Sequence, residues 1–259
     1  MSVGARTALV RAADENQVRA FQLLVPHASS PNAATATFGE VVAVVTATPS
    51  AFFNPIIVAG DSASEADVRA AVTFANERGV RPSLQVRTDL EPAAAVVAGE
   101  LDYVRAEPPT PGLALGPVPT TIPVAPPELE IETAIDQAGV ERWFASADTM
   151  RPFIPASFGL DPDVRLVVGA VDGVPVTNAA AVRSDGAIGI YAVGTTESVR
   201  RRGYGAAITW AAIQAGREAW GDAPAILQSS EMGLGVYRSM GFREICRYAI
   251  WYPAPAVPG

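Results

Sequence analysis

Three arginines and two glycines between Arg200 and Gly205 form the stretch of this sequence best suited to bind an anion. The apolar residues of Ile188–Val193 have the composition of a β-strand, and after Gly203 the apolar positions recur at helical spacing. A helix start leaves N–H groups without partners and carries positive partial charge, so it favours anions before any side chain is counted. Glycine has no Cβ to hold a phosphate away from those amides, and arginines add charge and forked donors. The stretch therefore predicts a pyrophosphate-binding turn between a strand and a helix.

The commoner phosphate-binding motifs are missing from this sequence. A P-loop needs Gly-x-x-x-x-Gly-Lys-Ser/Thr, and the dinucleotide fingerprint needs Gly-x-Gly-x-x-Gly at the start of a βαβ unit. Neither string occurs. The pattern that is present is Arg-x-x-Gly-x-Gly, from Arg200 to Gly205.

This pattern resembles the acyl-CoA pyrophosphate loop of the GNAT superfamily of N-acyltransferases. Over residues 129–253, roughly half of the chain, the surrounding segments also resemble that family. In order they are similar to its bulged strand, the helix after the loop, the next strand and the Tyr-x-x-x-Gly-Phe segment: Tyr191–Thr195, Ile208–Trp220, Ala225–Ser229 and Tyr237–Phe242.

The resemblance implies an α+β GNAT fold, with a mixed central sheet flanked by helices, and acetyl-CoA as co-substrate. Two strands would splay apart after the bulge, and acetyl-CoA would lie between them. Backbone groups at the bulge would bind its pantetheine arm, and the amides of residues 201–206 its pyrophosphate. The implied acetyl-CoA-binding residues are Val193, Gly194, Thr195, Arg200, Arg201, Arg202, Gly203, Tyr204, Gly205, Ala206, Ser229 and Ser230.

Acetyl transfer to an amine requires a neutral nucleophile, a polarised thioester carbonyl and a proton for the departing thiolate. A lysine-type amine has a pKa near 10.4, so a general base or a water relay must remove a proton at neutral pH. Backbone N–H groups at the bulge can polarise the carbonyl. Tyr237 matches the family's tyrosine, which implies that it is the general acid for the sulfur.

The general base stays unassigned at this point. Glu231 is a candidate, and Glu141 and Asp148, on a predicted helix beside the acceptor site, are further candidates. Many relatives have an asparagine-containing segment before the tyrosine, whereas this chain has Ser229–Gly235. This departure leaves the proton route open.

The first half of the chain also alternates strands with helices, and it resembles the degenerate half of tandem GNAT proteins. Its helix near Ser64 opens with Glu65 and Asp67, whose carboxylates would repel a phosphate. Eight prolines between residues 108 and 127 predict a linker over about 107–127, in which Leu113–Leu115 can pack as an edge strand. We therefore expect a structural half at 1–127 and a catalytic half at 128–259.

The composition of the chain argues against several other kinds of function and site. The chain has 259 residues, a formal charge of -8 and a pI of about 4.8, which argues against a nucleic-acid-binding role and suits a cationic amine. His27 and Cys246 are the only histidine and cysteine, so we expect neither a metal site nor a disulfide. No apolar run reaches the length of a membrane span, and the charged start does not resemble a signal peptide, so a cytoplasmic location is expected.

The sequence thus predicts an N-acetyltransferase that moves an acetyl group from acetyl-CoA to a primary amine of a small molecule or peptide by direct attack. A non-catalytic acyl-CoA-binding regulatory module remains as the alternative, because no base stands out. The acceptor, the acyl-chain length and the oligomeric state, a homo-oligomer included, stay open.

Overall fold

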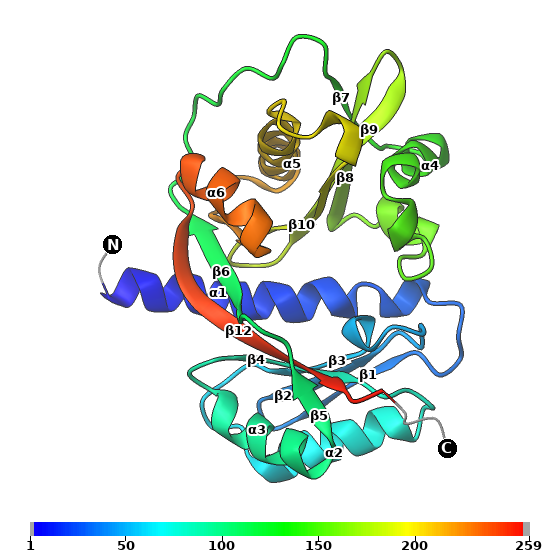
Figure 1. Ribbon diagram of the computed structural model, residues 1–259, viewed down its shortest axis with the longest axis vertical. Helices are drawn as coiled ribbons and strands as arrows, with labels where there is room; N and C mark the ends of the chain where they lie inside the picture. The colour runs from blue at the N-terminus through cyan, green and yellow to red at the C-terminus, as the bar shows by residue number, and fades with distance from the viewer. Residues whose placement is uncertain (1–2, 256–259) are drawn as a thin grey trace. The chain divides into compact units, whose positions relative to one another are not determined.

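The structure, a computed structural model, describes residues 3–255. Two compact units divide the chain (Figure 1). The amino-terminal unit consists of Phe21–Pro111 and the chain from Cys246 onward, and the carboxy-terminal unit consists of the chain up to Ala20 and Gly112–Ile245. No helix within residues 3–255 is long and apolar enough to cross a membrane.

These compact units differ from the expected halves at two segments and at the boundary. The first helix groups with the carboxy-terminal unit, where the Asn16 amide donates to Val182 O over 3.1 Å. The end of the last strand groups with the amino-terminal unit, because residues 248–251 pair antiparallel with residues 84–87. The boundary falls at Gly112 because Leu113–Leu115 pair with residues 225–227. The division into repeats at 1–127 and 128–259 stays a prediction.

The amino-terminal unit is a sheet in the order β1-β2-β3-β4-β12, with β5 paired to β12. Only β3 and β4 pair in parallel. Helices α2 and α3 lie on one face of this sheet (Figure 1). The elements are η1 Val25–His27, β1 Ala34–Phe38, β2 Val41–Val45, η2 Ala51–Phe53, β3 Pro55–Val58, α2 Glu65–Asn76, β4 Ser83–Arg87, α3 Glu91–Glu100, β5 Tyr103–Arg105 and β12 Arg243–Pro253.

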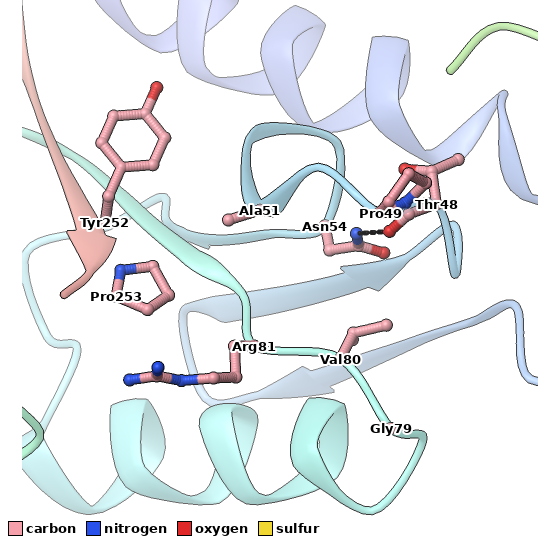
Figure 2. Close-up of a pocket in the computed structure, with 9 residues that line it drawn as sticks. All are labelled: Thr48, Pro49, Ala51, Asn54, Gly79, Val80, Arg81, Tyr252 and Pro253. Carbon is pink, nitrogen blue, oxygen red and sulfur yellow. Dashed lines mark hydrogen bonds between the residues drawn. The ribbon is translucent and has the colours of Figure 1, made fainter. Parts of the chain in front are cut away.

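A cavity of about 310 Å³ lies in the amino-terminal unit (Figure 2). Asn54 and Arg81 line it, and they precede β3 and β4, so it lies where those two parallel strands begin. The Asn54 amide donates to Thr48 O and Ser50 O, and its oxygen accepts from the amides of Thr46 and Ala47. Because its polar atoms are all bonded within the loop, Asn54 serves to shape the loop.

The carboxy-terminal unit has a sheet in the order β6-β11-β10-β9-β8-β7, in which β10 and β11 pair in parallel and the other pairs are antiparallel. Helices α4 and α5 lie on opposite sides of β8 and β9 (Figure 1). The elements are α1 Val3–Gln22, β6 Thr110–Leu115, β7 Glu130–Thr133, α4 Gln137–Ser146, η3 Asp148–Met150, η4 Ala156–Leu160, β8 Val164–Val171, β9 Val174–Arg183, β10 Ile188–Thr195, η5 Glu197–Val199, α5 Tyr204–Trp220, β11 Ala225–Gln228 and α6 Glu231–Ser239.

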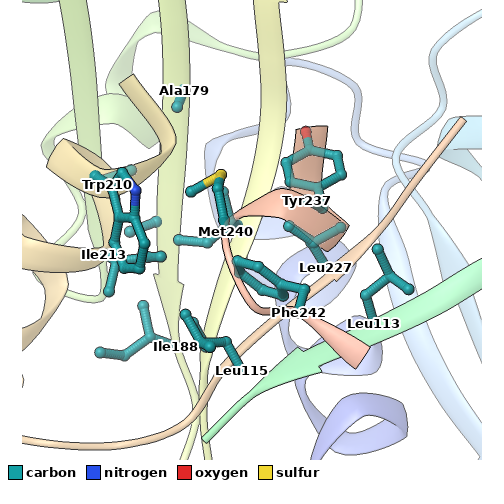
Figure 3. Packing of buried hydrophobic residues seen from close by; sticks show 14 of the residues in the cluster. Leu113, Leu115, Ala179, Ile188, Trp210, Ile213, Leu227, Tyr237, Met240 and Phe242 are labelled. Carbon is teal, nitrogen blue, oxygen red and sulfur yellow. The ribbon is translucent and has the colours of Figure 1, made fainter. Parts of the chain in front are cut away.

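The core of this unit forms between α5 and the sheet (Figure 3). Ile208, Ala212 and Ile213 recur at helical spacing and pack as one buried face. Ala179 and Ala181 of β9 lie in the same cluster, so their neighbours Asn178 and Ala180 point to the opposite face of the sheet. The two faces of β9 therefore separate the α5 side from the α4 side.

Helix α1 is tied to the same sheet through one buried asparagine, Asn16. Its Nδ2 donates to Ser184 Oγ over 2.9 Å, and its Oδ1 accepts from the Tyr191 hydroxyl over 2.7 Å. Gly189 of β10 leaves the space for this side chain, because a Cβ there would lie 1.9 Å from Asn16 Oδ1. Burial raises the pKa of Tyr191, so its hydroxyl keeps the proton that it donates.

We expect Gly189→Ala to lower the free energy of unfolding by about 2 kcal/mol, since the bonded Asn16 amide cannot move aside without losing its partners. Urea denaturation followed by circular dichroism measures this. The matched control is Gly99→Ala in α3, where a Cβ would meet nothing within 4 Å and helix propensity should add about 0.5–1 kcal/mol. Equal midpoints for the two variants would contradict the prediction.

Candidate functional site

Strand β10 contains a β-bulge at its second half, as the sequence predicts. Tyr191 pairs with Ala180 of β9, but the next pair is Gly194 with Asn178, so two residues of β10 oppose one of β9. One of the two, Ala192, has φ +49°, the left-handed region that non-glycine residues rarely adopt. The bulge turns backbone groups of β10 out of the ladder and leaves them for another partner.

The ladder between β10 and β11 ends at the bulge. Their parallel pairing covers Ile188–Ile190 with Ala225–Leu227, after which β11 ends at Gln228 while β10 continues on β9 to Thr195. The expected opening between two splayed strands stays a prediction, which this end of the pairing supports. The residues of β10 from Tyr191 to Thr195 are half-buried.

Helix α5 begins beside the end of β10. Its N-cap is Gly203, with φ +85° and no side-chain cap, and its first helical bond runs from Ala207 N–H to Gly203 O. The amides of residues 204–206 precede that bond and so have no helix carbonyl to donate to. The Arg200 Nε donates to Thr195 O over 3.1 Å, which fastens the loop to β10, while Arg201 and Arg202 are exposed. An anion would meet amides without helix partners and two exposed arginine residues here.

The two glycines of the loop have different roles. Gly203 is required by its backbone, because φ +85° strains any residue with a Cβ. Gly205 has no such requirement, and a Cβ there would meet only Thr195 Oγ1, at 3.8 Å. Its missing side chain therefore keeps the helix start open from outside.

Solved structures match this architecture over nearly the whole chain. A GCN5-related N-acetyltransferase from Kribbella flavida aligns with TM-score 0.71 and 22% identity, covering 93% of this chain and 96% of that one. A tandem GNAT protein from the clavulanic acid biosynthesis pathway aligns with TM-score 0.57 and 13% identity, covering 94% and 97%. This chain has the tandem GNAT fold. A GCN5-related N-acetyltransferase-like protein from Streptococcus suis shares the GNAT fold at TM-score 0.56 and 16% identity, covering 86% and 84%. No family model and no curated protein matches the sequence.

The expected α+β fold with two GNAT-like halves is thereby confirmed, and the amino-terminal half lacks the open helix start. There β3 stays paired with β4 along its whole length, from Pro55 to Val58. Helix α2 is closed by a capping box, in which Ser64 Oγ accepts from the Asp67 amide and Asp67 accepts from the Ser64 amide. The Ser64 hydroxyl and amide both donate to the Asp67 carboxylate and hold its pKa below the usual range, so that helix start carries a negative charge.

Tyr237 lies in α6, which follows β11 in the GNAT fold. Its ring is buried and meets Phe242 edge-on, with ring centroids 5.8 Å apart, and its hydroxyl points away from Leu227 and Phe242 (Figure 3). Burial raises the pKa of Tyr237, opposed by the nearby Thr209 hydroxyl. The phenol therefore stays protonated at neutral pH, as a proton donor must.

The other predicted residues of α6 and its start are placed differently. Ser229 is buried and donates to Ser230 O over 2.7 Å, whereas Ser230 caps α6 by accepting from the Gly233 amide over 3.3 Å. Glu231 is exposed in the first turn of α6. The two serines thus shape the loop after β11, and the role of Glu231 as a base stays a prediction.

Tyr204 reaches away from the loop that it belongs to. Its side chain is buried, and its hydroxyl donates to Glu128 Oε1 over 2.8 Å. Only the amide of Tyr204 is left for a ligand. The Glu128 pKa is lowered by its own backbone amide and the Tyr204 hydroxyl, with a smaller effect of Arg202, so this carboxylate stays charged close to the loop.

Sequence reasoning missed the β9 residues that hold the bulge. Thr177 Oγ1 donates to Gly194 O over 2.7 Å and lies 3.0 Å from Thr195 Oγ1. Asn178 Nδ2 donates to Ala192 O. A signal was present, since Thr177 and Asn178 are adjacent polar residues inside an otherwise apolar, buried strand.

The predicted acceptor-side helix, expected at 141–150, begins and ends four residues earlier. Residues 141–150 divide between α4, which begins at Gln137 and ends at Ser146, and η3 from Asp148. Glu141 forms an ion pair with Arg151 over 2.9 Å, and both side chains are about half exposed. Within residues 3–255, no cluster of three or more His, Cys, Asp or Glu side chains could hold a metal ion.

Proposed function

We propose that this chain is an N-acetyltransferase that moves the acetyl group of acetyl-CoA to a primary amine of a small molecule or peptide. The observation that carries the proposal is the uncapped start of α5 beside the end of β10, where the pairing of β10 with β11 has stopped. Its backbone donors, its glycines and its two exposed arginines suit a pyrophosphate. The bulge lies on the neighbouring strand, where a thioester at the end of the same ligand would sit.

The residues present fit acetyl-CoA. The amides of residues 204–206, with Arg201 and Arg202, would hold the pyrophosphate, and the β10 backbone at Val193 and Thr195 would hold the pantetheine arm. When bound, acetyl-CoA supplies an activated acetyl group. The amino-terminal half offers no equivalent site, because the Asp67 carboxylate occupies its helix start.

The transfer requires the amine nitrogen to bond to the acetyl carbon while the carbon–sulfur bond breaks and its electron pair leaves with sulfur. The amine gives up one proton to a base or to water, and the sulfur takes up another. Tyr237, a protonated phenol whose pKa burial raises further, is the donor that we assign to the sulfur. Backbone N–H groups at the bulge polarise the carbonyl that is attacked.

Isothermal titration with acetyl-CoA, followed by a screen of primary amines with detection of free thiol, tests the proposal. We expect micromolar binding and thiol release that depends on one class of amine. No binding would refute the proposal. Binding without transfer to any amine would favour the alternative, a non-catalytic acyl-CoA-binding module.

The same titration carries a second prediction, that one acetyl-CoA binds per chain. The reason is that α2 starts with the capping box of Ser64 and Asp67, whereas α5 starts with an uncapped glycine. A stoichiometry of two would contradict the assignment of the amino-terminal half as purely structural. Asp67→Asn serves as the control variant and should leave the stoichiometry at one, because Ser64 still caps α2.

A further inference from the structure

Asn178 of β9 is buried directly beneath the bulge of β10. It is 3% exposed, on the face of the sheet opposite α5. Its Nδ2 donates to Ala192 O over 2.5 Å. Ala192 is the bulge residue in the left-handed conformation, so this side chain replaces a ladder bond that the bulge has broken.

The orientation of the Asn178 amide follows from that bond. A carbonyl oxygen needs a donor, so Nδ2 must face Ala192, and Oδ1 is turned toward Gly194. A Cβ on Gly194 would lie 2.9 Å from Oδ1, so the glycine leaves the room that this orientation needs. Oδ1 is buried and accepts no hydrogen bond from any residue of 3–255, although such an atom costs stability.

A second side chain, Trp143 of α4, also supports the bulge. Ala179 is the β9 residue that the two bulge residues oppose, and its carbonyl accepts from Trp143 Nε1 over 2.9 Å. Trp143 is fully buried in α4. The bulge is thus held on the α4 side by an amide and an indole, and by the Thr177 hydroxyl on the α5 side.

We infer that Asn178 is a positioning residue for acyl transfer. It holds Ala192 in its strained conformation and thereby fixes the direction in which the β10 N–H groups point at the thioester carbonyl. The unpaired Oδ1 is the stability cost of that geometry. The inference rests on the proposed function, because a bound thioester is what those N–H groups would polarise.

Isotope-edited infrared spectroscopy of acetyl-CoA labelled with ¹³C at the carbonyl tests this inference without turnover. In the wild-type complex we expect the carbonyl stretch to move to lower frequency than in free acetyl-CoA. Asn178→Leu, which has similar volume and no donor, should lose most of that shift. It should also lower kcat about 100-fold, because small misplacement of reacting groups costs that much. Its Kd for acetyl-CoA should stay within about threefold of the wild type, since the pyrophosphate contacts are unchanged.

Val182→Ala is the matched control. Val182 is buried on the same face of β9, and the variant is destabilised without touching the bulge, so both the infrared shift and kcat should be retained. Asn178→Ala serves as a second variant if Asn178→Leu does not fold, with the same expected losses.

An Asn178 variant that keeps both the infrared shift and kcat would overturn this inference and leave the proposed function standing. A loss in Val182→Ala equal to that in the Asn178 variants would also overturn it, by making stability the cause. Failure of the wild type to bind acetyl-CoA would overturn the proposed function and this role together.

Discussion

Gly205→Asp is expected to lower the affinity for acetyl-CoA by about 100-fold or more while the protein stays folded. The new carboxylate would stand among the free amides of α5, where a pyrophosphate would bind. Two unit charges about 4 Å apart repel by about 4 kcal/mol near a protein surface, and salt reduces this. The same substitution should stabilise helix α5, because an acid in the first turn and the loss of a glycine each contribute about 0.5–1 kcal/mol.

Titration calorimetry at low and high salt, together with a thermal melt, measures both effects. Gly205→Asn is the control of equal size, and it should bind acetyl-CoA much more tightly than Gly205→Asp does. We choose Gly205 over Gly203, since the φ of +85° at Gly203 would strain any substituted residue and confuse folding with binding. An aspartate variant that melts normally and binds like the wild type would place the ligand elsewhere.

Tyr237→Phe is expected to lower kcat by about 100-fold or more and to leave acetyl-CoA binding nearly unchanged. The ring that packs against Phe242 is retained, so the fold should persist, while the proton for the departing sulfur is lost. Single-turnover measurements with a saturating amine separate this chemical step from product release. Tyr103→Phe is the control, because Tyr103 is also buried but lies in the amino-terminal unit, and its kcat should equal that of the wild type.

The pH dependence gives the Tyr237 assignment a further check. Burial raises the pKa of Tyr237 above its ordinary value of 10.0, so the proton-carrying form persists from neutral pH up to and beyond that value. We therefore expect no loss of kcat from this group between pH 7 and pH 9, whereas a base that must lose a proton would make kcat rise with pH. A fall of wild-type kcat in that range that is absent in Tyr237→Phe would show that Tyr237 loses its proton there, which would contradict its raised pKa.

Local pattern was enough to predict the central part of the site. The hairpin turn at Asp172 and Gly173, which leads into β9, follows from turn chemistry, and both turn residues have the positive φ that such a turn requires. The glycine positions predicted the turn into α5, although the helix begins at Tyr204, ahead of the apolar face at Ile208. These features depend on residues that are close together in the sequence, so periodicity and residue type are enough to predict them.

Other parts of the site could not be read from the sequence. The sequence does not distinguish the roles of Asn16 and Asn178. In the structure Asn16 bonds helix α1 to the sheet, whereas Asn178 bonds the bulge of β10. The end of β12 pairs with β4 although more than half of the chain separates them. The Tyr204 hydroxyl donates to Glu128, so its side chain does not face a ligand at the loop.

By itself the sequence determined a helix start with glycines and arginines directly after a strand, and predicted that it binds an anion, because that feature needs only a few consecutive residues with the right backbone freedom and charge. Only the tertiary structure decided which side chains hold the bulge and which helix start stays open. Those outcomes depend on strand register and on helix packing, which join residues far apart in the chain, and no local period records such contacts.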